Sequence, residues 1–459
     1  MRSENDMKAM KAQEIAEAVG GKLLCGDPDT LITNVQYDSR SVGEGSLFVP
    51  IKGERVDAHQ FIEQCMKKGA ATFTEYEAPA GAEKPYIKVE DTLKALQKLA
   101  AFYRKQFSSL KLVGVTGSVG KTSTKEMIAA ALSEGLNVMK TQGNKNSQIG
   151  MPCTMFDLSD EHEAAVIEMG ISEFGEMDNL CDIARPDIAV MTNIGVAHIE
   201  NLKTQENIMA EKLKITNHFD KDDILFVNGD DKLLSTLCGK QPFKTVSFGL
   251  AETNDYHADN IETYGFDTTF RCIGGGTEKN FTIPALGIHS VTNALAAIAI
   301  GRTLGLDDDT IQKGLSGYKN APMRQQIHQL EKFTLIDDSY NASPEATKVS
   351  LDVLKSISKE KSIAVLADML ELGEKAPSEH YGVGKHLAEI GIDCLIAIGS
   401  LSENTATGAK ENGCKNVLTA QNNAEAYEIL KTLLSENCTV LVKGSRGMHT
   451  DEIVKKLLS

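Results

Sequence analysis

Short apolar runs alternate with longer segments of helical pattern along the middle of the chain. From Leu112 onward, the runs LVGVT, AAVIEMG, DIAVMTNIG and DILFVNGDD each precede a segment with apolar residues at helical spacing. Continuous apolar runs are typical of strands buried on both faces, because crossover helices cover both sides of a parallel sheet. The pattern predicts a mostly parallel central sheet with flanking helices.

The same alternation returns after Pro322, in the runs FTLIDDSY, SIAVLADM, CLIAIGS and TVLVKGS. This repetition predicts a second α/β domain of Rossmann-like type. In NASPEATKVSLDVLKSI, Ser343 suits the N-cap of a helix and Pro344 its first position. Between the two alternating regions, TFRCIGGGTEKNFTI reads as a β-hairpin that turns at residues 274–276.

The first part of the chain has shorter β-type runs, at Val35, residues 47–49 and residues 86–89, and a helical pattern in AHQFIEQCMKKGA. A small α/β module is therefore expected, followed by a helix over residues 91–107. A chain of 459 residues fits about three domains at roughly 150 residues each. The predicted fold class is α/β with three domains, over residues 1–88, 89–321 and 322–459.

Composition and charge restrict the classes of function that this chain can have. With 41% hydrophobic and 24% charged residues, the chain is of ordinary globular type. It has no signal-peptide pattern and no apolar run that could span a membrane, so a cytoplasmic protein without membrane insertion is expected. Nine cysteines without metal-ligand spacing indicate reduced thiols. The net charge of -16 argues against nucleic-acid binding.

One stretch, LVGVTGSVGKTSTKEMIAAAL, carries a phosphate-binding pattern. After the strand, Gly117 and Gly120 allow a tight turn whose N–H groups point at phosphate oxygens. Lys121 would reach the β- and γ-phosphates of a nucleotide, and the Thr122 hydroxyl would bind Mg²⁺. The usual pattern has glycine where this chain has Val115, so the loop is a variant. A glycine-rich turn without ligand is the structural alternative.

Three further stretches, VIEMG, TNIGVAHIE and MAEKLKI, place Glu168, His198 and Lys212 after the loop. Together with GVTGSVGKTS they resemble the Mur ligases, ATP-dependent amide-forming enzymes of peptidoglycan synthesis. The resemblance covers essentially the whole chain. The stretches DSRSVGEGSLFVPIKGERVDAHQF, TQGNKNSQIGMP, IDDSYNASPEA, VLADMLELG and VKGSRGM resemble the member that joins D-alanyl-D-alanine to UDP-N-acetylmuramoyl-tripeptide. The DNPR motif, which is typical of the member that adds the third amino acid, is absent here. Two positions depart from the pattern of the family that the chain resembles: Ser147 stands where Asn is often found, and Ala367 where Gly is usual.

The resemblance implies that ATP phosphorylates the terminal carboxylate of the peptide, and that the dipeptide amine then attacks the acyl phosphate. It makes Lys121, Glu168, His198 and Lys212 catalytic. Thr122 and Glu168 would hold one Mg²⁺ between the β- and γ-phosphates. His198 would bind a second Mg²⁺, with a carbamate on Lys212 as its neighbour or ligand.

By the same resemblance, the N-terminal module binds the UDP-sugar, the central domain binds ATP, and the C-terminal domain binds the incoming dipeptide. Besides Lys121, the implied ATP-binding residues are Gly117, Ser118, Val119, Gly120, Thr122, Ser123, Asn293, Arg324 and Asp338. His289 accompanies Asn293 in GIHSVTNALAAIAIG as a further candidate. The candidate residues for UDP-sugar, peptide and dipeptide are Asp38, Ser39, Arg40, Asn144, Asn146, Lys443, Ser445 and Arg446. A monomer is expected.

Structural alternatives stay open for several of these residues. Asn293 would also suit a helix N-cap, DSRS at residues 38–41 could be a plain turn, and Arg324 and Asp338 could form a salt bridge that caps the domain. The segment 443–446 could be a solvated loop, and ADMLELG suggests packing alone. For function, folate polyglutamate synthesis is the enzymatic rival, but the extra domain over residues 1–88 favours the UDP-sugar. A nucleotide-dependent switch would not need Glu168, His198 and Lys212 together. The third residue of the acceptor peptide, lysine or diaminopimelate, is left open.

Overall fold

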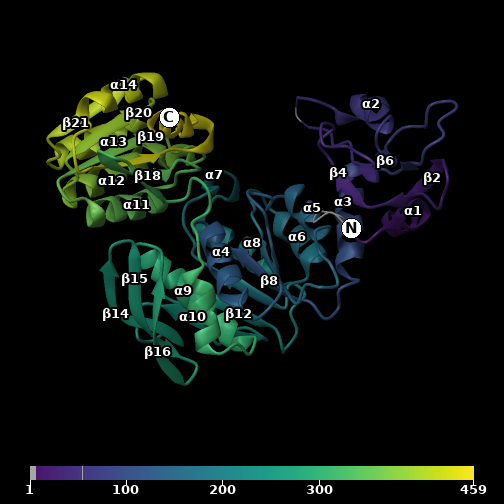
Figure 1. Ribbon diagram of the computed structural model, residues 1–459, viewed down its shortest axis with the longest axis horizontal. Coiled ribbons are helices and arrows are strands. Elements are labelled where there is room, and N and C mark those ends of the chain that lie inside the picture. Colours follow the sequence, from purple (N-terminus) through teal and green to yellow (C-terminus); the bar gives the residue numbers. More distant parts are fainter. Residues whose placement is uncertain (1–6, 54) are drawn as a thin grey trace.

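The computed structural model describes residues 7–53 and 55–459, so the first six residues of the predicted N-terminal domain lie outside the described residues. Three lobes follow one another along the chain, with the central lobe between the other two (Figure 1). Each lobe has its own sheet, within residues 22–88, 111–283 and 326–443. The prediction of a three-domain α/β fold is confirmed, and the exact boundaries stay predictions.

The N-terminal lobe holds a five-stranded sheet in the order β2-β7-β6-β5-β4. β4 to β7 run parallel and β2 pairs antiparallel with β7. The strands are β2 (Lys22–Cys25), β4 (Asn34–Gln36), β5 (Ser46–Phe48), β6 (Ala71–Thr74) and β7 (Tyr86–Lys88). The remaining elements are β1 (Met10–Lys11), β3 (Leu31–Ile32), α1 (Ala12–Val19) and α2 (Ile62–Met66). Helix α3 (Thr92–Arg104), N-capped by Asp91, leads into the central lobe.

The central sheet has nine strands in the order β16-β15-β14-β13-β12-β11-β8-β10-β9. β8 to β14 are parallel, and β15 and β16 extend the edge as the predicted antiparallel hairpin. The strands are β8 (Lys111–Thr116), β9 (Val138–Lys140), β10 (Ala164–Glu168), β11 (Ile188–Met191), β12 (Ile224–Asn228), β13 (Lys244–Gly249), β14 (Tyr256–Tyr264), β15 (Asp267–Gly274) and β16 (Thr277–Ile283).

Helices cover both faces of this sheet, as expected. Along β8, Leu112 faces one hydrophobic cluster while Val113 and Val115 face the other, because successive side chains of a strand point to opposite faces. The helices are α4 (Lys121–Leu132), α5 (Gly150–Met155), α6 (Glu176–Ala184), α7 (Ile199–Leu202), α8 (Gln205–Leu213), α9 (Ile288–Thr303) and α10 (Asp308–Ser316). The carboxyl ends of β8, β10 and β11 therefore meet at one edge, where the phosphate loop begins.

The C-terminal lobe has a six-stranded sheet in the order β17-β18-β22-β19-β20-β21, parallel except for the edge strand β17. The strands are β17 (Gln326–Gln329), β18 (Phe333–Asp338), β19 (Lys361–Ala367), β20 (Cys394–Ile398), β21 (Asn416–Ala420) and β22 (Cys438–Lys443). The helices are α11 (Pro344–Ile357), α12 (Ala376–Glu389), α13 (Ser402–Glu411), α14 (Asn423–Leu433) and α15 (Asp451–Leu458). The predicted cap of α11 is confirmed, because Ser343 Oγ accepts a hydrogen bond from the N–H of Ala346.

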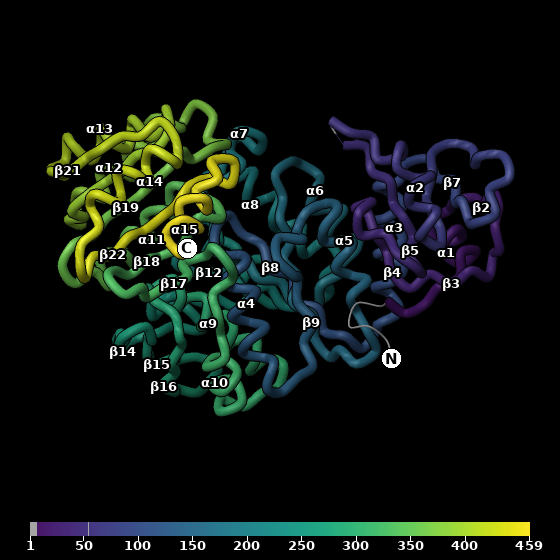
Figure 2. Tube along the Cα trace, turned by 45° about the horizontal axis from the view of Figure 1, so that its top comes forward, coloured from purple at the N-terminus to yellow at the C-terminus, as the bar shows by residue number. Residues whose placement is uncertain are grey.

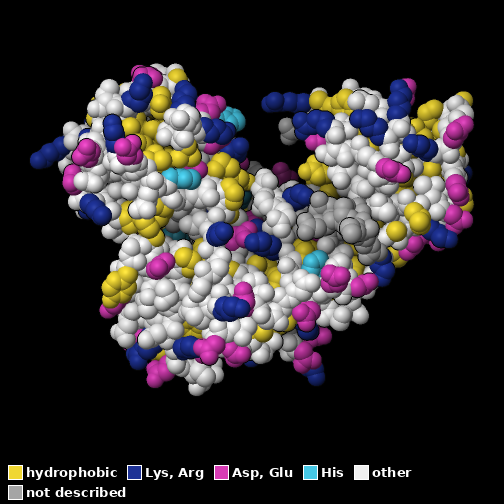
Figure 3. Space-filling view, viewed as in Figure 1, with side chains coloured by type: hydrophobic (Ala, Val, Ile, Leu, Met, Phe, Trp, Pro, Cys, Tyr) yellow, Lys and Arg dark blue, Asp and Glu magenta, His cyan; other side chains and the backbone are white. Residues whose placement is uncertain are grey.

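The surface view shows a wide notch between the N-terminal and C-terminal lobes, open above the central lobe (Figure 3). Within the described part of the chain, no helix has the length and apolar character that crossing a bilayer requires. All nine cysteines are described, and none forms a disulfide.

Candidate active site

The phosphate loop connects β8 to α4, and two glycines make its path possible. Gly117 has φ 150°, and a Cβ placed there would lie 1.9 Å from Thr192 Oγ1. Gly120 has φ 83° and is the N-cap of α4. Side chains rarely adopt such backbone angles, so both positions favour glycine. The following helix then points the N–H groups of its first turn at the space above the loop.

Two polar residues at the end of a neighbouring strand hold this loop in place. Thr192 and Asn193 follow β11, the neighbour of β8 in the sheet. Thr192 Oγ1 donates a hydrogen bond to the Val119 carbonyl at 2.6 Å, and Asn193 Oδ1 accepts one from the Val119 N–H at 2.9 Å. Sequence analysis missed both residues, although polar residues directly after a buried strand were the available signal.

Lys121 folds back onto its own loop. Its Nζ donates to the carbonyls of Gly117 at 2.7 Å and Ser118 at 3.1 Å. Withdrawal from water lowers the pKa of this amine to about 8; the Glu168 carboxylate opposes the shift and the Arg324 charge adds to it. A bound phosphate would compete with the loop carbonyls for this cation.

Glu168 ends strand β10 beside the loop and is only 1% exposed. Asn146 Nδ2 donates to its Oε1 at 2.6 Å, whereas its buried Oε2 has no hydrogen-bond partner among the described residues. Gly170 makes room for this pair, because a Cβ there would lie 3.1 Å from the Asn146 side chain. One carboxylate oxygen is therefore held and the other is free to bind a cation. Asn146, predicted to line the peptide path, lines the cavity and also contacts Glu168 directly.

Lys212, on α8, is 1% exposed, and its Nζ has no hydrogen-bond partner in the described part of the chain. Burial lowers its pKa well below the usual value, and the nearby Lys121 charge adds to the shift. Its neighbour Glu211 faces away from it and accepts hydrogen bonds from the N–H groups of Gly175 at 2.7 Å and Met177 at 3.4 Å, where α6 begins. Lys212 lies behind the cavity wall rather than on it.

His198 precedes α7 and reaches the C-terminal lobe. Its Nδ1 lies 2.9 Å from Oε2 of Glu371, which belongs to the ADMLELG stretch. This hydrogen bond lowers the pKa of the Glu371 carboxyl, against the opposing effect of burial. The expectation that ADMLELG serves packing alone is therefore incomplete, because one of its side chains contacts a predicted catalytic residue.

The predicted ATP residues Arg324 and Asp338 belong to the C-terminal lobe and line the same cavity as the phosphate loop. Asp338 ends β18 and forms a buried ion pair with Lys443, at 2.5 Å between Oδ2 and Nζ. Burial lowers the pKa of Lys443, and the Asp338 charge opposes this shift. Arg324 stacks on Tyr340 with 4.1 Å between guanidinium and ring centroid. Lys443, a predicted substrate contact, lines the cavity while its charge is paired with Asp338.

Asn293 lies inside α9, whose N-cap is Gly287, so the alternative that Asn293 caps a helix is wrong. Its Oδ1 accepts a hydrogen bond from Thr124 Oγ1 on α4 at 2.9 Å. His289, one turn earlier, is hydrogen-bonded through Nε2 to Gln325 Oε1 at 3.0 Å. Both residues line the cavity next to the phosphate loop.

The remaining candidates are more scattered. Asp38 and Arg40 form an exposed ion pair in the turn after β4, where Arg40 lowers the pKa of the Asp38 carboxyl to about 2. Ser39 lies between them, and Asn144 is exposed in the loop after β9. Ser445 and Arg446 line the cavity, although Ser445 Oγ accepts the Leu370 N–H at 2.9 Å and Arg446 pairs with Asp451 at 3.2 Å.

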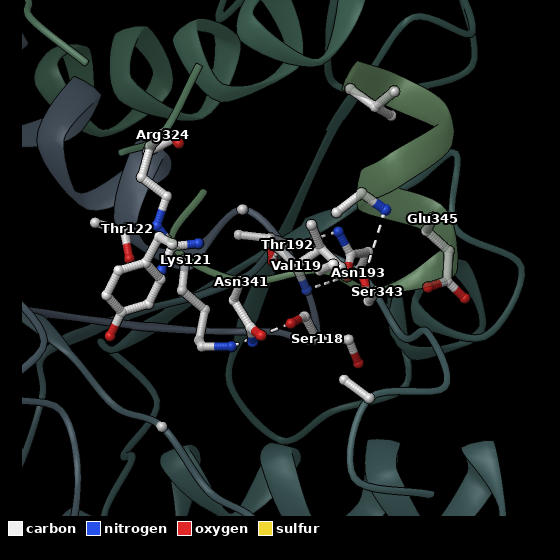
Figure 4. Close-up of a pocket in the computed structure, with 18 of the residues that line it drawn as sticks. Ser118, Val119, Lys121, Thr122, Thr192, Asn193, Arg324, Asn341, Ser343 and Glu345 are labelled. Atoms are coloured by element: carbon white, nitrogen blue, oxygen red, sulfur yellow. Dashed lines mark hydrogen bonds between the residues drawn. The ribbon is translucent and has the colours of Figure 1, made fainter. Parts of the chain in front are cut away.

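These walls enclose a cavity of about 560 Å³ between the central and C-terminal lobes. In Figure 4, Lys121, Thr122 and Arg324 lie on one side of the view, and Ser343 and Glu345, at the start of α11, lie on the other. The tube view likewise places α4, α9 and the C-terminal lobe around one centre (Figure 2). Of the predicted residues, Ser118 to Ser123, Asn146, Glu168, His198, Asn293, Arg324, Asp338, Lys443, Ser445 and Arg446 line it. The predicted residues that do not line it are Asp38, Ser39, Arg40, Gly117, Asn144 and Lys212.

The donor set at the loop fits Mg²⁺. Among the described residues, no three His, Cys, Asp or Glu side chains gather as a ready-made metal cage. Mg²⁺ in nucleotide sites is usually held by only one or two protein ligands, with phosphates and waters completing the octahedron. The partnerless Oε2 of Glu168 and the Thr122 hydroxyl at the start of α4 satisfy that requirement.

Comparison with known proteins gives matches to all three lobes of the chain. Models of the Mur ligase family catalytic domain, the Mur ligase middle domain and the Mur ligase glutamate ligase domain match residues 31–104, 115–301 and 323–446. The UDP-N-acetylmuramoyl-tripeptide–D-alanyl-D-alanine ligase of Bacillus subtilis (strain 168) is 38% identical over 97% of this chain and 98% of its own length. The chain belongs to the Mur ligase family.

Two solved structures are similar over nearly the full length. MurF from Acinetobacter baumannii superposes with a TM-score of 0.90 at 31% identity, covering 98% of this chain and 99% of its own. MurF ligase from Thermotoga maritima, in complex with ADP, gives a TM-score of 0.82 at 30% identity, covering 92% and 96%.

Proposed function

We propose that this protein is an ATP-dependent ligase that joins D-alanyl-D-alanine to UDP-N-acetylmuramoyl-tripeptide, giving the UDP-muramoyl-pentapeptide, ADP and phosphate. The observation that carries the proposal is a nucleotide phosphate loop facing the buried Glu168, in a chain similar over nearly all its length to ligases of that name. A nucleotide switch would not need Glu168, His198 and Lys212 together.

The reaction needs an activated acyl group, because a carboxylate resists attack by an amine. A carboxylate oxygen of the tripeptide attacks the γ-phosphorus of ATP, the bond to ADP breaks, and an acyl phosphate forms. The dipeptide amine then attacks the acyl carbon, the carbon–oxygen bond to phosphate breaks, and the amine loses a proton. Closure of the cavity by the C-terminal lobe would keep water from this intermediate.

The loop residues bind and orient the phosphates. The N–H groups at the start of α4 and the Lys121 amine face the β- and γ-phosphates, where charge develops during transfer. Glu168 and Thr122 would hold Mg²⁺, and His198 would hold a second ion. Bound there, the metal neutralises the charge of the phosphates and carboxylate as they approach. Asn146 keeps Glu168 oriented through its 2.6 Å hydrogen bond.

Lys212 is proposed to carry a carbamate. Burial without a partner favours the uncharged amine, which is the form that attacks CO₂. A nitrogen–carbon bond forms, one proton leaves, and the lysine becomes an anion. The new charge would turn repulsion between Lys212 and Lys121 into attraction. It would also supply a negative group behind the cavity wall for the second metal.

The three lobes would bring three substrates to one site. We place ATP between α4, α9 and the C-terminal lobe, with Asp338 toward ribose and Arg324 toward phosphate. The UDP-sugar would lie on the N-terminal lobe near residues 38–40, with the dipeptide near Ser445 and Arg446. A monomer suffices, because one chain holds all the proposed groups. The nine unpaired cysteines favour action in the reducing cytoplasm.

The proposed function is tested by incubating the protein with ATP, Mg²⁺, UDP-muramoyl-tripeptide and D-alanyl-D-alanine. Phosphate release should match pentapeptide formation measured by mass, and omission of the dipeptide should abolish the amide product. Comparing tripeptides that end in lysine and in diaminopimelate would identify the acceptor. Turnover with folate and glutamate, without pentapeptide formation, would refute the proposal.

A further inference from the structure

Two loops from different lobes meet beside the cavity. One comprises residues 195–202, the end of the connection after β11 together with α7, and the other comprises residues 369–373, between β19 and α12. Helix α7 lies against the C-terminal lobe in both ribbon and tube views (Figures 1 and 2), and it packs on the short helix Gly373–Lys375. We call this contact the seam. Apolar residues are buried on both sides of it, Val196 and Ile199 on one and Met369 and Leu372 on the other, within a large hydrophobic cluster that extends through the lobes.

The C-terminal lobe contacts the loop that carries His198 at more than one point. A Cβ at Gly195 would lie 3.0 Å from the carboxyl carbon of Glu345, so a larger residue there would displace that carboxylate. The Val196 N–H donates to Glu345 Oε1 at 3.4 Å. On the other side, a Cβ at Gly373 would lie 3.7 Å from the Glu200 side chain. The C-terminal lobe thus touches the loop that carries His198 from two directions.

The polar centre of the seam is the pair His198 and Glu371. Nδ1 and Oε2 lie 2.9 Å apart, and both residues have left-handed backbone angles, with φ 60° and 64°. Non-glycine residues hold such angles only where surrounding contacts fix them, and they gather at functional sites. The pair is 30% and 66% exposed in its side chains, so it adds little to stability and its variants should fold.

The loop that carries Glu371 is held by hydrogen bonds within the C-terminal lobe. The Met369 N–H donates to Nε2 of the buried His380 at 2.9 Å, and the Leu370 N–H donates to Ser445 Oγ at 2.9 Å. Met369 and Leu372 are buried on either side of the exposed Leu370 and Glu371. The position of the Glu371 carboxylate is therefore set by the C-terminal lobe rather than by the loop it touches.

We propose that Glu371 is a positioning residue that fixes the ring and tautomer of His198 from the C-terminal lobe, so that the active site is complete only when the two lobes meet. The Glu371 carboxylate accepts a hydrogen bond from the Nδ1–H of His198. The proton is thereby held on Nδ1, and Nε2 is left as the basic nitrogen of a ring that lines the cavity. The inference rests on the proposed function. The ADMLELG stretch, which contains Glu371, would then orient a catalytic histidine in addition to packing.

The test compares Glu371→Ala and Glu371→Gln with Glu374→Ala. Glu374 is exposed three residues further on and forms no ion pair with any residue that the structure describes. For Glu371→Ala, kcat should fall by about 30-fold with each KM changed less than about twofold, because groups that orient a metal-binding histidine are worth roughly 10- to 100-fold. Glu371→Gln, which keeps an acceptor oxygen, should lose less. Glu374→Ala should match the native protein.

A second readout does not depend on turnover. Protein labelled with ¹⁵N in histidine side chains should show the His198 ring protonated at Nδ1, with the signal assigned by its absence in His198→Gln. In Glu371→Ala the ring should shift toward the other tautomer, and in Glu374→Ala it should not. In a His198→Gln background, Glu371→Ala should cost no further activity.

An unchanged ring and unchanged kcat in Glu371→Ala would overturn the inference. So would a loss confined to the KM of the dipeptide, which would make Glu371 a substrate contact, or a further loss in the His198→Gln background. If the native protein itself makes no pentapeptide, the proposed function fails, and the ring signals still decide whether Glu371 sets the state of His198.

Discussion

Two lysines of the central lobe are equally buried and differ in their partners. Lys125, on α4, is 0% exposed and donates to the Thr141 carbonyl at 2.7 Å and to Glu126 Oε1 at 2.8 Å. Lys212, on α8, is 1% exposed and has no hydrogen-bond partner among the described residues. A buried ammonium with a carboxylate and a carbonyl is part of the scaffold. A buried amine without partners is held in a reactive state, so partners rather than burial separate the two roles.

The other two lysines of the site fall between these limits. Lys443 is paired with Asp338, and Lys121 is bound by two carbonyls of its own loop. The carbonyls leave Lys121 without a fixed countercharge, which suits a cation that must meet phosphate. The buried lysines therefore form a series: the more completely the amine is paired, as in Lys125, the more structural is its role, and the less it is paired, as in Lys212, the more it is suited to chemistry.

The largest effect should come from Lys212→Ala. Without the side chain that carries the carbamate, kcat should fall by roughly 10³-fold, the loss expected for one group that stabilises transition-state charge. Formate or acetate should restore part of the activity by supplying a carboxylate in the vacated space. Pentapeptide formation, measured with and without each anion, provides the readout.

Lys125→Met serves as the matched control for that variant. Its specific activity should stay near that of the native protein, and neither anion should change it. Full activity of Lys212→Ala without added anion would remove the reason to distinguish the two lysines.

Stability should change in opposite directions in the two methionine variants. Lys125→Met loses charge-assisted hydrogen bonds and should lower the free energy of unfolding by about 2 kcal/mol. Lys212→Met replaces a partnerless buried amine by an apolar side chain, so it should not destabilise the protein and should gain about 1 kcal/mol. Urea unfolding in buffer free of CO₂, nucleotide and metal measures both. Equal losses in the two variants would contradict the partner argument.

A smaller, pH-dependent effect is expected at Lys121, whose pKa of about 8 lies below the usual 10.5. Bound phosphate raises the pKa, so above pH 8 the protein must take up a proton to bind ATP. Affinity should therefore fall with rising pH, by roughly tenfold between pH 7.5 and 9.5.

Calorimetry at constant Mg²⁺ and ionic strength would follow both the affinity and the proton uptake. Lys125→Met should reproduce the native curve, while Lys121→Met should bind weakly at every pH. A native affinity that does not vary over this range would show that Lys121 keeps its charge without ATP.

Local patterns predicted the phosphate loop well. Strand, glycine turn and helix start are adjacent in sequence between Leu112 and Thr122, so short-range rules determine them. The Ser343 cap and the hairpin around residues 274–276 were predictable for the same reason. The neighbours that hold the loop, Thr192 and Asn193, depend on strand order, because β11 pairs with β8 across a long stretch of chain.

Contacts between distant elements escaped prediction. The burial of Lys212 depends on how α8 packs against the rest of the lobe, which the helical spacing of one segment does not determine. The N-cap interpretation of Asn293 is wrong because α9 begins earlier, at Ile288. Glu371 and Glu345 approach the loop around His198 only through the packing of two lobes, for which a single sequence carries no local signal.

The reaction itself is tested most directly with tripeptide substrate whose terminal carboxylate carries ¹⁸O. Transfer of the γ-phosphate to that carboxylate predicts that each phosphate released with the pentapeptide contains one oxygen from the substrate. Mass analysis of the phosphate would detect it. Pentapeptide formed together with unlabelled phosphate would contradict the acyl-phosphate route and the roles assigned to the loop, Glu168 and Lys212.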